Sequence, residues 1–406
     1  MNLRPNLLSL GKLCILIFVL YTGWYRYAYG IKQVLLYAPP IVLTGIILLH
    51  MTTHGNLNVK DCPSIIVVFF VLAIYSFLIG SIVAVKRSYC ISSVATFFAH
   101  SVICFSVYYI SKEEGNINWI LNILILCGII CSAYIFFRGY EYETSGVNAI
   151  TLGEDSNPNI FGLVMITSIF ALIYDFDKFK KRIALNIILI ATFSVVVIMT
   201  ASRECFLTLG VVLIWWIFSF MNTLAKEEGS NKKLFHNSIY QILLLVGIIF
   251  GIIYLTKNFE STSIYTKIMN SITKGDGVTS RTKLYSEAWI LFKRHYPVGV
   301  GFDQFRFYSS EGLYSHSTYA EIASCLGLCG LLIFFVPVFL KYFEMMFVFL
   351  HNRDYKISML CLMFTAELIL ALGLIIVYEI YQMLVLTLVF YEWQKQTIEQ
   401  GNIQKD

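Results

Sequence analysis

Three arginines in this sequence could bind an anion. Two of them, Arg138 and Arg203, stand at the ends of long apolar runs, where a charged side chain is costly unless it has a partner or a function. Arg203 lies in the short break 200–204 (TASRE), Arg138 follows another apolar run, and Arg281 begins the polar stretch 280–294. A guanidinium group matches phosphate oxygens bidentately, so these arginines predict an anion site. The structural alternative is that Arg203 snorkels to the surface or pairs with Glu204, and that Arg281 is solvated in its loop.

A second group of reactive side chains is the segment 315–321 (SHSTYAE), which precedes another apolar run. His316 can titrate near neutral pH and accept a proton from a hydroxyl group. Tyr319 and Glu321 follow closely and are candidates to bind a substrate or to orient the histidine. The alternatives are a purely structural histidine at a boundary, and Glu321 or Glu379 as a buried partner of an arginine.

The composition indicates what kind of scaffold holds these residues. Of the 406 residues, 58% are hydrophobic and 14% are charged, and the mean hydropathy is +0.71. These values predict an all-α, polytopic integral membrane protein, and we expect one membrane domain over residues 1–406. The net charge of +5 has no basic face with interleaved aromatic residues, so no nucleic-acid partner is expected. No CxxC pair or metal-ligand cluster stands out, so we expect neither a metal site nor a cofactor.

Apolar runs of spanning length predict about twelve transmembrane helices. The expected spans are 7–24, 33–51, 63–85, 89–110, 117–137, 158–174, 183–200, 204–221, 237–255, 319–341, 357–375 and 377–393. Lysine and arginine in the short loops concentrate on one side, which predicts both termini in the cytoplasm. All the polar segments described above then fall on the outer face.

One long polar loop, 256–318, separates the ninth and tenth expected spans and lies on the outer side. Loops of this length are commonly functional. Within it, Leu284, Ala288, Leu291 and Phe292 recur at helical spacing, which predicts a helix that lies on the membrane surface or caps the bundle. Pro297, Gly299 and Gly301 predict a turn that re-enters the membrane. Further along, Gly327 and Gly330 predict close helix packing.

The order of these segments resembles the O-antigen ligase and polymerase superfamily, which contains the Wzy-type polysaccharide polymerases and the lipid A-core O-antigen ligases. A TASR-type break precedes a long outer loop with S-R-x-x-x-Y and P-x-G-x-G, and an H-S-x-Y-x-E segment leads into G-x-x-G. The matching positions are Thr200, Ser202, Arg203, Ser280, Arg281, Tyr285, Pro297, Gly299, Gly301, Phe305, His316, Tyr319, Glu321, Gly327 and Gly330. The run 157–162 (NPNIFG) is also similar, whereas Ser317 and Ala320 depart from the commonest form.

The resemblance implies a glycosyltransferase in the bacterial inner membrane that uses an undecaprenyl-diphosphate-linked glycan donor at its periplasmic face. Arg203 and Arg281, with Arg138 as a third, would bind the diphosphate, and fixed arginines would replace a metal. His316 would be the base for an inverting displacement, with Tyr319 and Glu321 beside it. A lipid-linked repeat unit or lipid A-core is the expected acceptor, membrane lipid surrounds the protein, and a chain-length regulator is an expected protein partner.

Three activities remain open on this basis. A polymerase transfers the growing chain to the next lipid-linked repeat unit, and the H-S-x-Y-x-E form favours it. A ligase transfers the finished glycan to lipid A-core. A flippase or transporter of the same lipid-linked sugars would place charged residues along a path through the membrane, whereas the arginine and histidine candidates here gather on one face.

Overall fold

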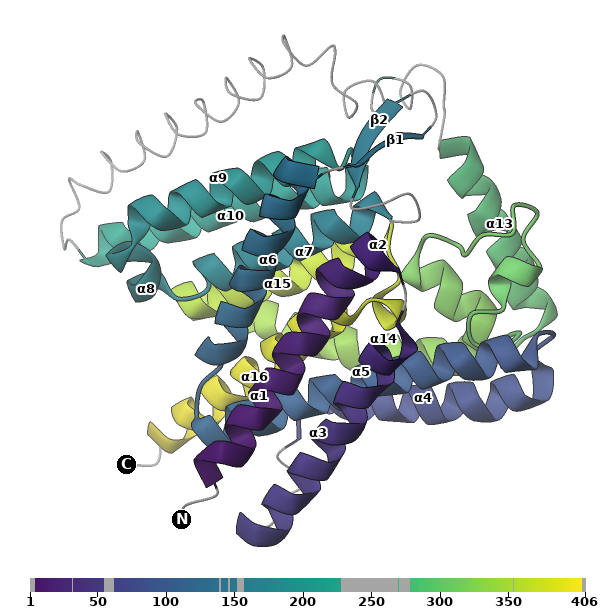
Figure 1. The fold of residues 1–406 in the computed structure, drawn as a ribbon, viewed down its shortest axis with the longest axis horizontal. Coiled ribbons are helices and arrows are strands. Elements are labelled where there is room, and N and C mark those ends of the chain that lie inside the picture. Colours follow the sequence, from purple (N-terminus) through teal and green to yellow (C-terminus); the bar gives the residue numbers. More distant parts are fainter. Residues whose placement is uncertain are drawn as a thin grey trace.

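The computed structural model describes residues 4–30, 32–54, 62–138, 140–144, 147–151, 157–227, 269, 278–352 and 354–403. Within these ranges the chain is helical apart from its connections and one antiparallel hairpin of β1 and β2 (Figure 1). The elements are α1 (Arg4–Leu20), η1 (Tyr21–Tyr25), α2 (Arg26–Tyr29), α3 (Gln33–His54), α4 (Ser64–Val83), α5 (Arg87–Glu114), α6 (Asn118–Arg138), β1 (Tyr140–Thr144), β2 (Val147–Thr151), α7 (Pro158–Ile173), α8 (Phe176–Lys181), α9 (Ile183–Met199), α10 (Arg203–Glu227), α13 (Val278–Arg294), η3 (Phe305–Phe307), α14 (Thr318–Asn352), α15 (Tyr355–Leu370), η4 (Ile376–Tyr378) and α16 (Ile380–Ile403).

The predicted all-α membrane class is confirmed. Each expected span coincides with a helix, except 237–255, which lies outside the described residues. Among the described residues, 7 helices are long and apolar enough to cross a membrane, and α7 and α9 are shorter apolar helices. The two closely spaced pairs of expected spans are separate helices, α9 with α10 and α15 with α16.

Local sequence signals explain where several helices begin and end. The side chain of Asn157 accepts a hydrogen bond from the backbone of Asn159 ahead of Pro158, which is the favoured combination for a helix start. Asp354 caps α15 in the same way through the amides of Lys356 and Ile357. These caps satisfy amide groups that a helix leaves unpaired at its N-terminus.

Two helices form the centre of the bundle. Every residue from Ile160 to Ile173 of α7 is buried, and so is every residue from Ile380 to Trp393 of α16. The surrounding helices expose large apolar side chains instead, such as Ile41, Ile82 and Leu340. Apolar exposure of this extent suits hydrocarbon rather than water, so the outer helices present a lipid-facing surface.

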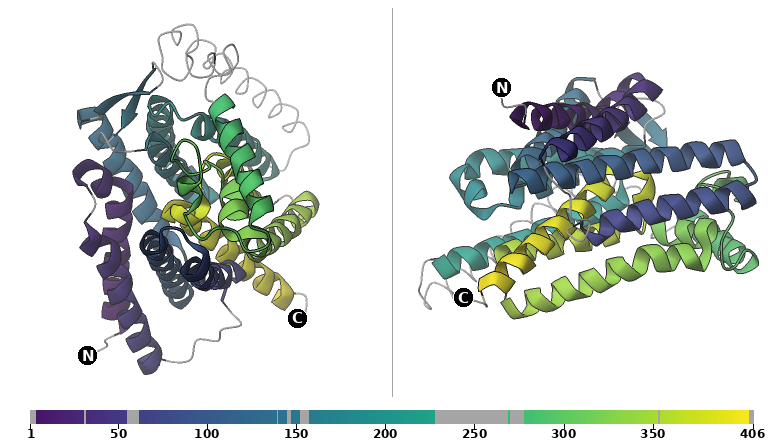
Figure 2. Two further views of the ribbon diagram at one scale, coloured as in Figure 1. Left: turned by 90° about the vertical axis from the view of Figure 1, so that its right-hand side faces the viewer. Right: turned by 90° about the horizontal axis from the view of Figure 1, so that it is seen from below.

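The bundle has two distinct ends. The N-terminus, the C-terminus and α8 lie at one end, and α13 lies at the opposite end (Figures 1 and 2). The helix α13 buries Leu284, Ala288 and Leu291, three of the four apolar positions that predicted it, and Phe292 is partly buried, while Trp289 and Ile290 are exposed. The apolar face of α13 therefore covers protein, as the capping alternative predicts.

The helix α14 contains a sharp kink at Gly327, whose φ of 67° lies in the left-handed region. The segment 297–301 fits into this kink: the amide of Gly301 donates to Cys325 O at 2.8 Å, and the amide of Cys329 donates to Pro297 O at 3.3 Å. A Cβ atom on Gly327 would collide with the carbonyl group of Pro297. The predicted role of Gly327 in helix-to-helix packing is therefore wrong, because what approaches it is the backbone of a loop segment.

We predict that Gly327→Ala and Gly299→Ala destabilise the protein by more than about 2 kcal/mol each, since both combine a positive φ with a backbone collision. The melting temperature in detergent should fall for both variants. Gly210→Ala is the control, because no atom lies within 4 Å of its added Cβ and its φ is not in the left-handed region. An unchanged melting temperature in Gly327→Ala would contradict the packing of the 297–301 segment against the kink of α14.

Candidate active site at the α13 end of the bundle

The two arginines expected at an anion site come together at the end of the bundle that carries α13. Arg203 is the first residue of α10, and its charge lies close enough to that of Arg281 in α13 for the two to interact. Glu204 forms a salt bridge with Arg281. Both side chains of this pair are largely covered, with 25% and 12% exposure for Arg281 and Glu204. The group Arg203, Glu204 and Arg281 is called the cationic cluster below, and it carries one net positive charge.

Glu204 therefore pairs with Arg281 across the bundle, and one of its roles is to hold that guanidinium in place. Its own side chain packs on Gly373, where a Cβ atom would collide with it. The hydroxyl of Tyr285 in α13 donates to Leu372 O at 3.0 Å. These contacts fix α13 against the start of α10 and against the residues that follow α15. An arginine has five N–H donors, so Arg281 keeps donors for an anion while it binds Glu204.

The backbone is strained at this end of the molecule. Among the described residues, the non-glycine positions with positive φ are Ala201 (50°), Asp303 (56°) and His316 (56°). Ala201 turns the chain between α9 and α10 just before Arg203. A non-glycine residue in this conformation costs on the order of 1–2 kcal/mol, and such positions cluster at functional sites.

His316 lies beside the cationic cluster, in the segment between η3 and α14. Its ring packs against that of Tyr314 with a centroid distance of 4.2 Å, and its Nδ1 atom is buried without a hydrogen-bond partner. Burial, together with the positive charge of Arg281, lowers the pKa of His316 to about 4, although Glu204 and Glu311 act in the opposite direction. The imidazole is therefore neutral at pH 7 and able to accept a proton.

Glu321 and Tyr319 lie near His316 but do not contact its ring through any hydrogen bond that the structure describes. Glu321 is 2% exposed and accepts from the amide of Ser315 at 2.8 Å and from the hydroxyl of Tyr378 at 3.0 Å. It therefore holds the backbone next to His316. Tyr319 stacks on Phe335 and donates to Leu368 O at 3.3 Å, so its polar atom is engaged within the bundle.

Arg138 is the third arginine predicted for the anion site. It is the last residue of α6, and its side chain is exposed. Among the described residues, the charged groups that act on Arg203 and His316 include Arg281 and Glu204 but not Arg138. Its role in binding an anion stays a prediction.

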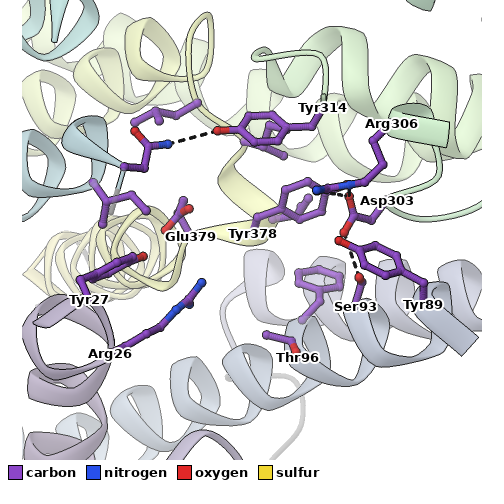
Figure 3. Close-up of a pocket in the computed structure, with 16 residues that line it drawn as sticks. Arg26, Tyr27, Tyr89, Ser93, Thr96, Asp303, Arg306, Tyr314, Tyr378 and Glu379 are labelled. Carbon is purple, nitrogen blue, oxygen red and sulfur yellow. Dashed lines mark hydrogen bonds and ion pairs between the residues drawn. The ribbon is translucent and has the colours of Figure 1, made fainter. Parts of the chain in front are cut away.

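A cavity of about 410 Å³ opens next to this group, and Tyr314 forms part of its wall. Figure 3 shows Arg26 and Tyr27 of α2 on one side, and Tyr89 of α5 with Asp303 and Arg306 on the other. Tyr378 and Glu379, from the break before α16, lie between them. Asn157 donates to the hydroxyl of Tyr314 at 3.1 Å and so fixes the ring that separates the cavity from His316. Burial, with the negative charge of Glu379, raises the pKa of Tyr314 to about 12, so its phenol group stays protonated.

The charged groups of the cavity are held in a defined arrangement. Arg306 donates from Nε and Nη2 to Oδ1 of Asp303, at 2.9 and 2.6 Å, and Ser93 donates to Oδ2 of the same carboxylate at 2.9 Å. Opposite this pair, Arg26 and Glu379 both line the cavity and lie close enough for their charges to interact. The proposed burial of Glu379 next to an arginine agrees with this arrangement, whereas the residue it meets, Arg26, was not among the predicted site residues.

Sequence reasoning missed Arg26, Asp303 and Arg306. Arg26 directly follows the first span, so it has the same sequence signal as Arg138, a cation at the end of an apolar run. Arg306 stands in the long polar loop, where charge is expected in any case. The signal that could have separated Arg306 from solvated residues is its position five residues after the P-x-G-x-G segment, next to apolar residues that the structure buries, such as Phe302 and Phe305.

The described fold and site define a multi-pass membrane protein with strained polar residues gathered at one end of a helical bundle. A family model described as O-antigen ligase matches residues 187–335, from α9 to the middle of α14. This match includes Arg203, Arg281 and His316, and it confirms the resemblance to the O-antigen ligase and polymerase superfamily over these residues. It supports a membrane glycosyltransferase-like enzyme that acts on lipid-linked glycans. Comparison with curated proteins gave no match.

We predict that Arg281→Gln raises the pKa of His316, because the substitution removes a positive charge that disfavours the imidazolium ion. The measurement is a pH titration of protein labelled with ¹³C-histidine in nanodiscs, with the His316 signal identified by its loss in His316→Asn. In the unmodified protein the signal should not titrate between pH 7 and 5.5. In Arg281→Gln the midpoint should rise above its position in the unmodified protein, and in Arg294→Gln, the control at the end of the same helix, it should not.

Proposed function

We propose that this protein is a polysaccharide polymerase, which transfers a growing undecaprenyl-diphosphate-linked glycan to the next lipid-linked repeat unit. The observation that carries the proposal is the convergence of Arg203, Arg281 and His316 beside one cavity, although they come from three separate segments. With the termini in the cytoplasm, as the loop charges predict, this end faces the periplasm of the bacterial inner membrane. Lipid-linked intermediates would reach it from the membrane, and a chain-length regulator would act as a separate partner.

The proposed chemistry is a single inverting displacement. The oxygen of the acceptor hydroxyl forms a bond with the anomeric carbon of the donor sugar. At the same time the bond from that carbon to the diphosphate oxygen breaks, and its electron pair leaves with the undecaprenyl diphosphate. The proton of the acceptor hydroxyl goes to the His316 imidazole. Arg203 and Arg281 stabilise the negative charge that develops on the leaving group, with Arg138 as a further candidate.

The electrostatics around His316 support a base that becomes stronger when the donor binds. Arg281 and burial keep its pKa low in the free protein. A bound diphosphate would bring negative charge beside the arginines and so raise the pKa of the imidazole. The base would then gain proton affinity at the time when a donor is present. Glu321 contributes by fixing the backbone of Ser315, and the role of Tyr319 in this scheme is to support α14.

A ligase that transfers the finished glycan to lipid A-core is the second candidate, and the description of the matched family model favours it. The two activities share a donor and a leaving group and differ in the acceptor. A flippase is less compatible with the structure, because the charged groups of the cationic cluster and of the cavity all belong to the α13 end of the bundle. If the purified protein in liposomes moved a lipid-linked glycan across the bilayer without transferring it, the enzyme proposal would fail.

We predict that His316→Ala and Arg281→Ala each reduce transfer by at least about 10²-fold, because one removes the base and the other a donor to the leaving group. Transfer of purified lipid-linked repeat units is measured in detergent, with the amount of folded protein checked by gel filtration. His316→Asn tests the same loss with a residue that tolerates a positive φ. The controls are His295→Ala and Arg294→Ala, exposed positions near the same end. Full-length polysaccharide in either site variant would rule out the assigned roles.

The product of a deletion strain distinguishes polymerase from ligase. Loss of a polymerase should leave a single repeat unit on lipid A-core, because ligation continues without chain growth. Loss of a ligase should leave polymer on the lipid carrier and bare core. Gel electrophoresis of lipopolysaccharide, together with analysis of carrier-linked glycans, reads out both results, and the second pattern would replace the polymerase proposal with the ligase.

A further inference from the structure

The cavity beside His316 differs in electrostatic character from the cationic cluster. Its ionisable pairs are Arg306 with Asp303, and Arg26 with Glu379, so each arginine has an acid beside it and the formal charges balance. The cationic cluster keeps one positive charge after Glu204 is counted against Arg203 and Arg281. A diphosphate is therefore attracted to the cluster, whereas a neutral ligand suits the cavity.

The cavity also presents hydrogen-bonding groups that have no hydrogen-bond partner among the described residues. No side-chain hydrogen bond of Arg26 or Glu379 is found among the described residues, although both charged groups line the cavity. Figure 3 shows both side chains directed into the same space. Arg26 and Glu379 are partly buried. Partly buried charged groups are costly unless a ligand, water or another charge satisfies them, so they indicate a polar ligand.

Four tyrosines also line the cavity: Tyr27, Tyr89, Tyr314 and Tyr378. Each tyrosine has an apolar ring and a hydroxyl group at its edge. The Cζ atom of Arg306 lies over two of these rings, 5.4 Å from the centroid of Tyr89 and 5.6 Å from that of Tyr314, and Arg26 lies over Tyr27 at 5.1 Å, so the rings hold both guanidinium groups in place. Hydroxyl and charged hydrogen-bonding groups set among aromatic rings suit a pyranose, which has apolar C–H groups and a rim of hydroxyl groups. The volume of about 410 Å³ lies within the range of small-molecule sites.

We propose that this cavity is a binding subsite for a neutral pyranose of the acceptor glycan, with Arg26 and Glu379 as its hydroxyl-binding residues and Asp303–Arg306 as its fixed wall. The inference rests on the proposed glycan transfer and specifies where the acceptor sugar lies. The acceptor is favoured over the donor for two reasons. The diphosphate of the donor suits the cationic cluster rather than the cavity, and Tyr314, which lines the cavity, contacts the ring of His316, so a sugar bound in the cavity lies next to the base.

Binding is tested without relying on transfer. The first probe is the repeat-unit glycan released by mild acid from the lipid-linked intermediates of a strain that lacks this chain, and the second is farnesyl diphosphate. Saturation-transfer NMR with detergent-solubilised full-length protein measures binding of each probe. Glu379→Gln and Arg26→Gln should weaken binding of the released glycan by about tenfold or more and leave farnesyl diphosphate unaffected. Arg281→Gln should show the reverse pattern.

The control is Asp177→Asn, which removes a charge from an exposed position of α8 at the opposite end of the bundle. It should change neither probe. Melting temperatures confirm that Glu379→Gln and Arg26→Gln are folded, and Asp303→Asn provides a third substitution in the cavity should either of them unfold. Equal binding of the released glycan by the unmodified protein and all folded cavity variants would overturn the proposal. Loss of farnesyl diphosphate binding in the cavity variants would also overturn it, because the cavity would then belong to the diphosphate site.

A kinetic experiment separates acceptor from donor. The donor is a lipid-linked repeat unit whose acceptor hydroxyl is capped, and the acceptor is an alkyl glycoside of the repeat unit. Glu379→Gln should raise the KM for the acceptor about tenfold while the KM for the donor stays unchanged. A rise in the donor KM alone would show that the cavity binds the donor sugar. If the unmodified protein transfers nothing, the proposed function fails, whereas the probe-binding result still decides whether the cavity holds a sugar.

Discussion

The structure depends on one constraint: a backbone amide or carbonyl group without a partner costs several kcal/mol in hydrocarbon. A break in a membrane helix exposes such groups, and this bundle has breaks at 200–202, at Gly327 and between α15 and α16. Neighbouring segments complete two of these breaks: the 297–301 segment bonds to the backbone around Gly327, and Thr318 at the start of α14 bonds to the segment between α15 and α16. Thr318 donates from its amide to Ala371 O at 2.9 Å and from its hydroxyl to Leu374 O at 2.7 Å, and it accepts from the amide of Ile376 at 3.0 Å. The non-helical segments gather at the α13 end of the bundle because they complete each other's hydrogen bonds there.

The packing of distant segments at the α13 end also determines which parts of the molecule could be predicted from the sequence. Helix positions follow from apolar runs and caps, so the expected spans agree with the described helices to within a few residues at most ends. His316, Arg203 and Arg281 were predicted from their types and their places beside these runs. The partners were not predictable, because the pairing of Arg281 with Glu204 and the meeting of Arg26 with Glu379 are created by packing between distant segments. For Gly327, the sequence predicted a close approach that requires a small residue. It did not show that the approaching group is the backbone of the 297–301 segment.

The charged residues at the α13 end form two groups with different proposed roles, the cationic cluster and the charged lining of the cavity. In the cationic cluster a single acid offsets two arginines, so an anion gains from binding there. In the cavity, each arginine has an acid nearby, so the gain comes from individual hydrogen bonds rather than from net attraction. The proposed reaction brings together a strongly anionic group, the diphosphate of the donor, and a neutral polyhydroxylated group, the sugar of the acceptor. The division of charge in the protein therefore matches the division between the two proposed substrates.

His316 stands between the two groups, and its properties depend on both. A base with a pKa of about 4 is mostly neutral at pH 7, but it is too weak to take a hydroxyl proton efficiently. The cause of that weakness is burial together with Arg281, and the second of these is the contribution that a bound diphosphate would offset. Tyr314, whose hydroxyl accepts a hydrogen bond from Asn157, packs against the ring of His316 at the wall of the cavity. Arg281 would then have two effects in the proposed reaction: it stabilises the leaving group, and it keeps the base weak until the donor is bound.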